Sequence, residues 1–487
     1  MHRPLISAIV VTYNSRRHIA ACLQSLARST IPPDEIIVVD NNSTDGTADF
    51  VRRTFSEVTL LDYCDNRGFA EGNNRAFRVA NGRFCFLLNP DATVAPDCLR
   101  HLLEAIEKGG RIGVAVPKVL LAREPSIINS AGLHVNRVGY GWDRGFLEWD
   151  RGQYDREASV VAGSGCAMLL RRSMLEEIGA FDSTYFLYYE DVDLCLRAWL
   201  TGFRVHYVPR AVAWHDMKVS GRPCYYNEYL DHTHRLRTML KNVPSPMLLA
   251  AAPRVLAFEL KSVVATIRAR RWKNLRWRLA AWRWNGRHLV SSLRLRARIQ
   301  RNRTIGGGAL RGRLTDGWGA PSARAAIPDY QEVYDSTVDS GRAGEAVSLG
   351  IDDAGRLGLG WYGCEEADGV RYRWSCGYGI VFLKHPDAGR NTTLRVLCRS
   401  PRQTLITVVV DGKRQGQWLI PPGGWTEHAL DIKAERPVVQ LVLVAEQTFV
   451  PAEVFPPSRD RRVLGLALSR VALEPSRQLA LSDLAVR

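Results

Sequence analysis

The fold of this chain is decided by the stretch Glu35-Ile36-Ile37-Val38-Val39-Asp40-Asn41-Asn42-Ser43, an apolar run that ends in polar residues. A continuous apolar run is typical of a strand that is buried on both faces. Similar runs occur at Ile6–Val11, Val58–Leu61 and Phe84–Leu88, and the segments between them have helical spacing of apolar residues. Strands that alternate with helices predict an α/β domain with a mostly parallel sheet.

Polar residues follow each of these predicted strands. They are Thr12-Tyr13-Asn14, Asp40-Asn41-Asn42-Ser43, the stretch Asn66–Asn74, which we expect to be a loop, and Asn89-Pro90-Asp91. Each group alone has an interpretation as turn chemistry, because Asn and Asp favour turns. Ligands of open parallel sheets bind beyond the carboxyl ends of the strands, so the coincidence favours a nucleotide cleft. The chain lacks both a G-x-G-x-x-G after its first strand and a P-loop motif, which disfavours dinucleotide enzymes and P-loop NTPases.

A second informative stretch is Tyr188-Tyr189-Glu190-Asp191-Val192-Asp193-Leu194-Cys195-Leu196-Arg197. Its apolar positions from Val192 onward predict a helix with one buried face. Glu190 and Asp191 then lie at the helix N-terminus, where the dipole favours ionised carboxylates. Capping of the helix is one interpretation of Asp191. A functional carboxylate is the other.

The positive charge is concentrated in one segment. Residues 254–303 hold 15 Lys and Arg against one acid, Glu259, whereas the whole 487-residue chain carries +16. Tryptophan and leucine recur there at helical spacing, as in helices that lie on an anionic membrane surface. Nucleic acid, an oligomer contact and an ordinary solvated face are the alternatives. Membrane docking is the interpretation we favour, with no nucleic acid as partner.

Composition sets further bounds. The length predicts about three domains, and we place them at residues 1–230, at residues 231–328 (a basic helical region with linkers at Gly306–Gly308 and 316–327), and at residues 329–487. The last segment has the short alternating runs of an antiparallel β-sandwich, in which Trp361 and Trp425 are either glycan contacts or core. Ten cysteines without a C-x-x-C pair suggest a reducing compartment. We find no secretory signal and no apolar run of the ~18–20 residues that span a bilayer.

In their order along residues 5–220, these motifs resemble family 2 glycosyltransferases of the GT-A fold, especially the rhamnosyltransferase-like branch. The resemblance rests on six motifs: Val10–Asn14, Val39–Thr47, Asn66–Asn74, Leu87–Asp91, Glu190-Asp191 and His215. It implies a GT-A domain that uses a nucleotide-diphosphate sugar as donor, with a jelly-roll-like accessory module at the C-terminus.

The resemblance also implies roles for individual residues. Donor binding falls to Thr12, Tyr13, Asn14, Asp40, Asn42, Asn66, Gly68, Asn73, Asn74, Asn89 and Asp91. Asp91 matches the last acid of the family's D-x-D motif, whose first acid is Asn89 here. Asp91 and His215 are the expected ligands of Mg²⁺ or Mn²⁺, although a lone histidine after an apolar run also has a structural interpretation. Gly163 and Ser164 either shape the acceptor pocket or form a glycine-rich bend.

The family inverts the anomeric carbon by direct displacement, which requires one general base. The resemblance assigns this role to Asp191, and an Asp with a pKa near ~4 is ionised at neutral pH. Glu190 and Asp193 are then supporting groups or solvated charges of the first helical turn.

We therefore expect a metal-dependent inverting glycosyltransferase that moves a sugar, such as rhamnose, to a lipid-linked or cell-envelope glycan. Its expected place is cytoplasmic, on the inner face of the cell membrane, held there by residues 254–303. The alternative is a non-catalytic glycan-binding or scaffold protein on a transferase fold. Homo-oligomerisation is left open.

Overall fold

The computed structural model describes residues 5–109, 111–216, 224–268, 270–315, 346–353, 356–385, 391–433, 438–455, 458, 460 and 462–475. The chain divides into two compact units, Met1–Ser322 and Ala323–Arg487. The contacts group the basic helices with the first unit. The predicted boundary at residue 230 stays a prediction, and the predicted linker at 316–327 lies outside the described residues.

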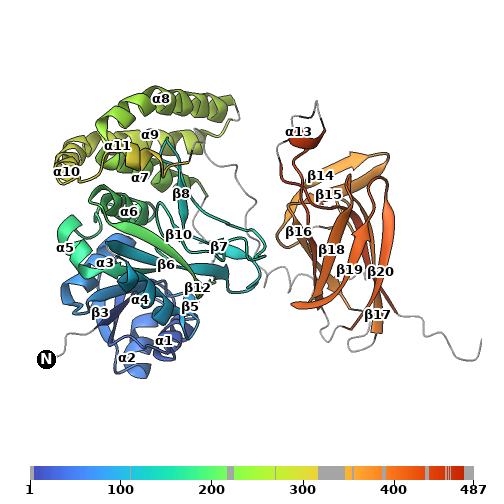
Figure 1. Ribbon diagram of the computed structural model, residues 1–487, viewed down its shortest axis with the longest axis horizontal. Helices are drawn as coiled ribbons and strands as arrows, with labels where there is room; N and C mark the ends of the chain where they lie inside the picture. Colours follow the sequence, from blue (N-terminus) through green and yellow to red (C-terminus); the bar gives the residue numbers. More distant parts are fainter. Residues whose placement is uncertain are drawn as a thin grey trace, which may run out of the picture. The chain divides into compact units, whose positions relative to one another are not determined.

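A mixed sheet organises the first unit (Figure 1). Its strands follow the order β10-β12-β6-β11-β4-β1-β2-β3, with β5 paired to β12 and β7 paired to β6. The strands are β1 (Ile6–Thr12), β2 (Glu35–Asn41), β3 (Thr59–Tyr63), β4 (Phe84–Leu88), β5 (Ala92–Val94), β6 (Ile112–Leu121), β7 (Ile128–Ser130), β10 (Ala158–Ser159), β11 (Ala167–Arg171) and β12 (Arg204–His215). Strand β1 runs parallel to β2 and β4, β2 to β3, and β6 to β12, whereas β11 is antiparallel to its neighbours β4 and β6. The predicted mostly parallel sheet is confirmed.

Helices cover both faces of this sheet because successive strand residues point in opposite directions. Val38 belongs to the apolar cluster under α1 (Ile19–Ala27), α2 (Thr47–Thr54) and α4 (Cys98–Lys108). Its neighbours Ile37 and Val39 belong to the other cluster, under α3 (Gly68–Val79), α5 (Arg172–Ile178) and α6 (Glu190–Leu200). A separate hairpin of β8 (Leu133–Val135) and β9 (Gly141–Asp143) adds to the second face.

Helix α6 differs from its prediction. The sequence pattern predicts one buried face, yet every residue of α6 except Asp191 is buried. The polar side is covered by α7 (Cys224–Asn242), whose Lys241 forms an ion pair with Asp193. Helices α8 (Ser245–Arg268), α9 (Trp272–Arg287), α10 (Leu289–Arg301) and α11 (Gly307–Arg311) follow. Helix α11 replaces the linker that we predicted at Gly306–Gly308.

The second unit is an antiparallel β-sandwich, as predicted. One sheet has the order β14-β15-β22-β17-β20 with β13 on β22, and the other has the order β16-β21-β18-β19. The elements are β13 (Ala346–Ser348), β14 (Trp361–Ala367), β15 (Val370–Ser375), β16 (Tyr378–Lys384), β17 (Asn391–Arg399), β18 (Thr404–Val410), β19 (Lys413–Ile420), β20 (Thr426–Lys433), β21 (Val438–Ala445), α13 (Pro451–Val454) and β22 (Ala467–Pro475). Trp361 donates its Nε1–H to the Ile380 carbonyl at 2.9 Å and packs against the core, so the core interpretation holds for it.

Two further observations concern the described residues only. No disulfide bond joins the cysteines among them. None of their helices combines the length and the hydropathy that a bilayer crossing requires.

Candidate active site

The polar ends of β1 and β2 meet at one edge of the sheet. Thr12 is paired in register with Asp40, and both residues are buried. Asp40 Oδ1 accepts the Ser43 N–H at 2.7 Å, whereas Asp40 Oδ2 and Thr12 Oγ1 have no hydrogen-bond partner. Burial raises the pKa of Asp40. Two neighbouring buried oxygens without partners are suited to accept or donate a hydrogen bond to a ligand.

The loops after β1 and β2 are joined by a hydrogen bond of the Asn14 side chain. Asn14 and Asn42 both have positive φ, of 53° and 66°. Asn14 Oδ1 accepts the Thr44 N–H at 2.8 Å, so its side chain holds the two loops in place. Tyr13, by contrast, has 46 % of its surface exposed, and its ring is available to contact a nucleobase.

The stretch Asn66–Asn74 is not the loop that we predicted, because α3 already begins at Gly68. Gly68 has φ of +83°, and a Cβ there would lie 2.1 Å from the Phe186 carbonyl oxygen. Asn66 Oδ1 accepts the Gly68 N–H at 2.9 Å. Asn73 is buried against Phe69, and Asn74 exchanges two hydrogen bonds with Phe181, of 2.9 and 3.0 Å. The side chains of Asn73 and Asn74 are therefore used in packing.

Asp91 and His215 form a contact beside the end of β4. The Asp91 Oδ1 atom lies 3.3 Å from His215 Nε2, and the pairing of β5 with β12 brings the two residues together. The Asp216 N–H donates to the Asp91 carbonyl at 2.8 Å, which clamps this loop to the end of β12. Burial would raise the pKa of Asp91, but the hydrogen bond and charge of His215 outweigh it and lower that pKa. Asn89, the neighbour from the motif, donates its backbone N–H to Cys166.

Asp191 is held by two backbone N–H groups. Its Oδ2 accepts the Gly165 N–H at 3.0 Å and its Oδ1 accepts the Val192 N–H at 2.7 Å. Burial raises its pKa, and these hydrogen bonds act in the opposite direction. The N-cap of α6 is Tyr189, which makes no capping hydrogen bond through its side chain. Asp191 is therefore not the N-cap residue, although its Oδ1 does accept the N–H of Val192 in the first turn of α6.

The glycine-rich turn opposite Asp191 is packed closely. A Cβ at Gly163 would lie 2.1 Å from a Val116 methyl, so glycine is required there for close packing. The Ser164 Oγ atom accepts the Cys166 N–H at 3.4 Å. The turn brings the Gly165 N–H to Asp191, and the carbonyl of the adjacent Cys166 accepts the Asn89 N–H at 2.8 Å, two residues before Asp91. Because Gly165 and Cys166 are adjacent, the loop that carries Asp91 lies close to Asp191.

The two other acids of the cluster differ from each other. Glu190 is buried, its Oε2 has no hydrogen-bond partner, and burial together with the charge of Asp191 raises its pKa well above the usual range. Asp193 is also buried, but it pairs with Arg197 at 3.0 Å and with Lys241 at 2.8 Å. The interpretation of either as a solvated charge is wrong. Asp193 fastens α6 to α7.

Sequence reasoning missed Asp143, the last residue of β9. Burial raises its pKa to about 6, and the charge of Asp191 adds to this, while hydrogen bonding to Ser130 and the charge of His215 act against it. Its Oδ1 atom is buried without a partner. The charges of both Asp191 and His215 act on Asp143, which is therefore near them. A three-residue strand has too little periodicity to reveal it.

Comparisons with known sequences show the family to which the chain belongs. The model of Glycosyl transferase family 2 matches residues 7–179. The chain is 31% identical over 242 residues to N-acetylglucosaminyl-diphospho-decaprenol L-rhamnosyltransferase of Mycobacterium tuberculosis, which is 45% of this chain and 78% of that relative. The chain belongs to glycosyltransferase family 2. The protein is a glycosyltransferase. It is also 23% identical to poly-beta-1,6-N-acetyl-D-glucosamine synthase of Staphylococcus epidermidis, over 43% of this chain and 49% of that relative.

Solved structures resemble the glycosyltransferase more distantly. GalNAc-T7 with UDP, GalNAc and Mn²⁺ has a TM-score of 0.41 at 15% identity, over 49% of each chain. Mannosyltransferase PcManGT from Pyrobaculum calidifontis, in complex with GDP-Man and Mn²⁺, has a TM-score of 0.38 at 20% identity. That match covers 64% of this chain and 86% of the other.

The Asp91–His215 pair of the glycosyltransferase fits a divalent cation bound together with a diphosphate. His215 Nδ1 lies 2.8 Å from Asn129 Oδ1, which holds the ring with Nε2 toward Asp91; Nε2 donates to Asp91 when the imidazole is charged, and loss of that proton would free its lone pair for a cation. Among the described residues no cluster of three or more His, Cys, Asp or Glu side chains is arranged to hold a metal. The side chains thus offer two ligands, and Mg²⁺ in such sites is commonly completed by phosphate oxygens and water.

Proposed function

We propose that the glycosyltransferase is metal-dependent and inverting, and that it moves a sugar from a nucleotide-diphosphate donor to a lipid-linked glycan acceptor at a membrane surface. The observation that carries the proposal is the proximity of Asp191 to the loop of the Asp91–His215 pair, since the adjacent residues Gly165 and Cys166 form hydrogen bonds to Asp191 and to Asn89. A general base and a diphosphate site within one cleft are what a single displacement needs. The name of the 31% identical relative makes rhamnose the first donor sugar to test.

In the proposed reaction, Asp191 accepts the proton of the acceptor hydroxyl as that oxygen attacks the anomeric carbon. Its two N–H contacts fix the direction of the carboxylate. The partnerless oxygens of Thr12 and Asp40 would bind the nucleoside, with Tyr13 beside them. A divalent cation bound at Asp91 and His215 would neutralise the charge that develops on the leaving diphosphate. Burial and the charge of Asp191 raise the pKa of Glu190, which favours Asp191 as the proton acceptor of the two.

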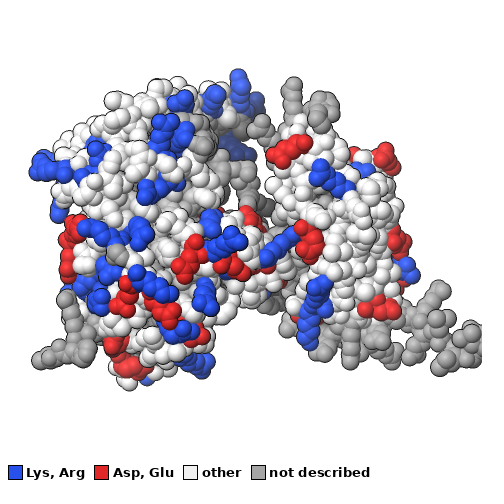
Figure 2. Space-filling model, in the orientation of Figure 1, with Lys and Arg blue, Asp and Glu red and all other residues white. Residues whose placement is uncertain are grey.

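The membrane part of the proposal is supported by α8. Leu249, Leu256, Leu260, Val264 and Ile267 are exposed and form one stripe along this helix. Figure 2 shows Lys and Arg side chains around the basic helices, whereas basic and acidic side chains are mixed over the sheet. Each Lys or Arg near an anionic membrane contributes about 1 kcal/mol of attraction. We place the enzyme on the inner face of the cell membrane.

A screen of nucleotide sugars tests the proposed reaction. The full-length protein, Mn²⁺ and a polyprenyl-diphosphate-linked N-acetylglucosamine would be incubated with each donor, and release of nucleoside diphosphate and extension of the lipid would be measured. With one of the donors, we expect the wild-type protein to release nucleoside diphosphate and to extend the lipid. The variant Asp191→Asn should do neither. Tight binding of glycans without any turnover would instead support the non-catalytic alternative.

A further inference from the structure

The first turns of α8 lie between two hollows that the reaction chemistry does not use. One is a cavity of about 560 Å³ between α8, α11 and the turn of the β8–β9 hairpin. Among the described residues that line it, four are arginines and none is Asp or Glu: Arg137, Arg254, Arg303 and Arg311. Its remaining lining is mostly apolar and includes Val243, Met247 and Leu314. We call it the arginine pocket.

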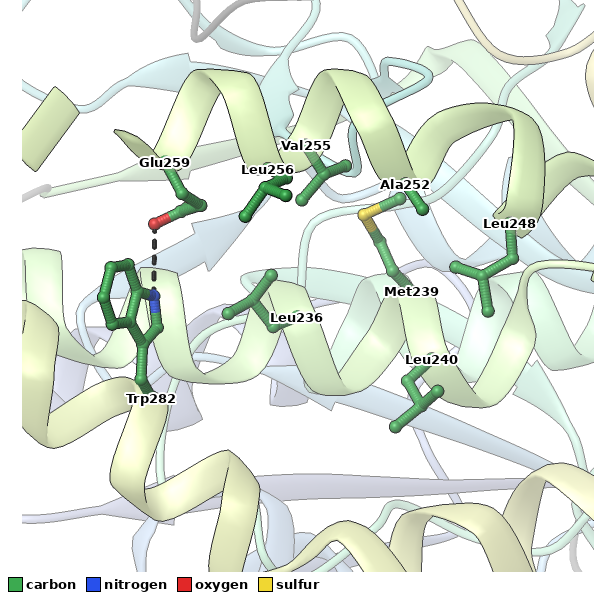
Figure 3. A pocket seen from close by; sticks show the side chains of 9 residues that line it. All are labelled: Leu236, Met239, Leu240, Leu248, Ala252, Val255, Leu256, Glu259 and Trp282. Carbon is green, nitrogen blue, oxygen red and sulfur yellow. Dashed lines mark hydrogen bonds between the residues drawn. The ribbon is translucent and has the colours of Figure 1, made fainter. Parts of the chain in front are cut away.

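The other hollow is an apolar groove of about 350 Å³ between α7 and α8 (Figure 3). Leu236, Met239 and Leu240 of α7 face Leu248, Ala252, Val255 and Leu256 of α8 across it. Glu259 closes one end, where it accepts a hydrogen bond from Trp282 Nε1 at 3.3 Å. Glu259 is also paired with Arg235 and Arg278, so its charge is neutralised and the groove remains apolar.

The two hollows are neighbours around α8. Met247 lines the arginine pocket, Leu248 lines the apolar groove, and Leu249 is 73 % exposed. Successive residues of a helix are about 100° apart around its axis, so the arginine pocket, the apolar groove and the exposed stripe occupy three different sides of α8, each next to the other two. A cationic site and a dry groove beside an exposed apolar stripe match an anionic head and the first part of a hydrocarbon chain that continues into the bilayer.

The arginine pocket is also connected to the candidate active site. Arg137 lies in the turn of the hairpin whose strand β9 ends at Asp143. Along the axis of the hairpin, Arg137 and Asp143 are separated by two strand residues and two turn residues. At about 3.3 Å per residue, this corresponds to roughly 13 Å. The hairpin is fixed, since Gly141 donates its N–H to Tyr189 Oη at 3.2 Å and Arg235 donates to the Val138 carbonyl at 2.7 Å. The fixed hairpin therefore keeps Arg137 at a set distance from Asp143.

We propose that the arginine pocket binds the diphosphate of the lipid-linked acceptor and that the apolar groove binds the beginning of its hydrocarbon chain. The guanidinium group is the side chain best suited to phosphate, because it donates in a planar fork and stays charged. The inference rests on the proposed function for the identity of the acceptor. It predicts that acceptor binding is independent of the donor.

The test is equilibrium binding of geranylgeranyl diphosphate to the full-length protein without donor or metal. Wild type is expected to bind it more tightly than inorganic diphosphate or geranylgeraniol. Arg303→Ala/Arg311→Ala should lose tenfold or more in affinity. The matched control Arg276→Ala/Arg283→Ala removes the same charge from exposed positions of α9 and should stay within twofold. Ala252→Trp, which fills the apolar groove, should weaken the binding of geranylgeranyl diphosphate but not the binding of inorganic diphosphate.

Several outcomes would overturn the inference. If the two double-arginine variants lose affinity equally, the ligand is attracted by the overall positive charge of the basic helices and not by the arginine pocket. Equal affinity for inorganic diphosphate would mean a free-phosphate site, and equal competition by phosphatidylglycerol vesicles would mean general membrane binding. Asp191→Asn should bind geranylgeranyl diphosphate like wild type. Failure of the proposed reaction is therefore measured separately from failure of this site.

Discussion

Replacement of Asp193 by alanine should cost the fold about 3 kcal/mol. The buried carboxylate lies 3.0 Å from Arg197 Nε and 2.8 Å from Lys241 Nζ, and it accepts a hydrogen bond from Asn242 at 2.8 Å. Removing one partner of a buried ion pair costs about 3–5 kcal/mol, because a charge is left uncompensated. Lys241 keeps its pair with Asp182, and Arg197 keeps three hydrogen bonds to backbone carbonyls, so the lower end applies.

The contribution of Asp193 to the stability of the fold depends on pH, and its sign follows from the shift of the Asp193 pKa. Burial would raise the pKa of Asp193, but the charges of Lys241 and Arg197 outweigh it and lower that pKa. A carboxyl group with a lowered pKa in the folded state stabilises fully above its unfolded pKa, about 3.9. This stabilisation is lost as the pH falls through the folded-state pKa. The gap between wild type and Asp193→Ala should therefore narrow below about pH 4.

Urea unfolding of the full chain, followed by tryptophan fluorescence, measures the cost. The control is Asp62→Ala, which removes an exposed ion pair with Arg52 of 2.7 Å, with side chains 44 % and 52 % exposed. Such surface pairs contribute about 0–1 kcal/mol. If Asp193→Ala costs no more than Asp62→Ala, the assignment of Asp193 as the fastener of α6 is refuted.

Three further outcomes are expected. Asp91→Ala should abolish the Mn²⁺-dependent part of donor affinity in calorimetry; unchanged affinity would remove Asp91 as a metal ligand. Leu260→Asp/Val264→Asp should reduce flotation with anionic liposomes several-fold without changing the unfolding midpoint, and unchanged flotation would exclude this stripe as the membrane contact. Gly68→Ala should destabilise the protein by more than Gly46→Ala, because both have φ near +80° but only Gly68 lacks space for a Cβ; equal unfolding midpoints would contradict the clash.

Much of the sheet can be predicted because its central strands β1, β2 and β4 are buried on both faces. Runs such as Ile36–Val39 are apolar whatever their neighbours are, and their ends are marked by Asp and Asn. The start of α6 at Glu190 is predicted for a similar local reason. The position of Asp191 in the cleft was a prediction from motif order, and its role stays a prediction.

What could not be predicted depends on contacts between distant residues. Gly68 begins a helix although Asn and Gly surround it, because its carbonyl accepts a hydrogen bond from Asn41 and Gly72 packs directly on Val11. The burial of the polar side of α6 depends on Lys241 and Asn242, far along the chain. Asp143 has no local signal at all, since only the folding of the hairpin brings it to Asp191.

The most direct test of the central claim is the initial rate of nucleoside diphosphate release by Asp191→Asn, with donor and acceptor at saturation. Loss of a general base lowers the rate by about 10²–10⁴-fold. We expect a loss in this range, with donor affinity unchanged. Asparagine keeps the shape of the side chain, but its single oxygen can accept only one of the two N–H bonds, so the unfolding midpoint should fall slightly. A rate equal to that of wild type would contradict the account.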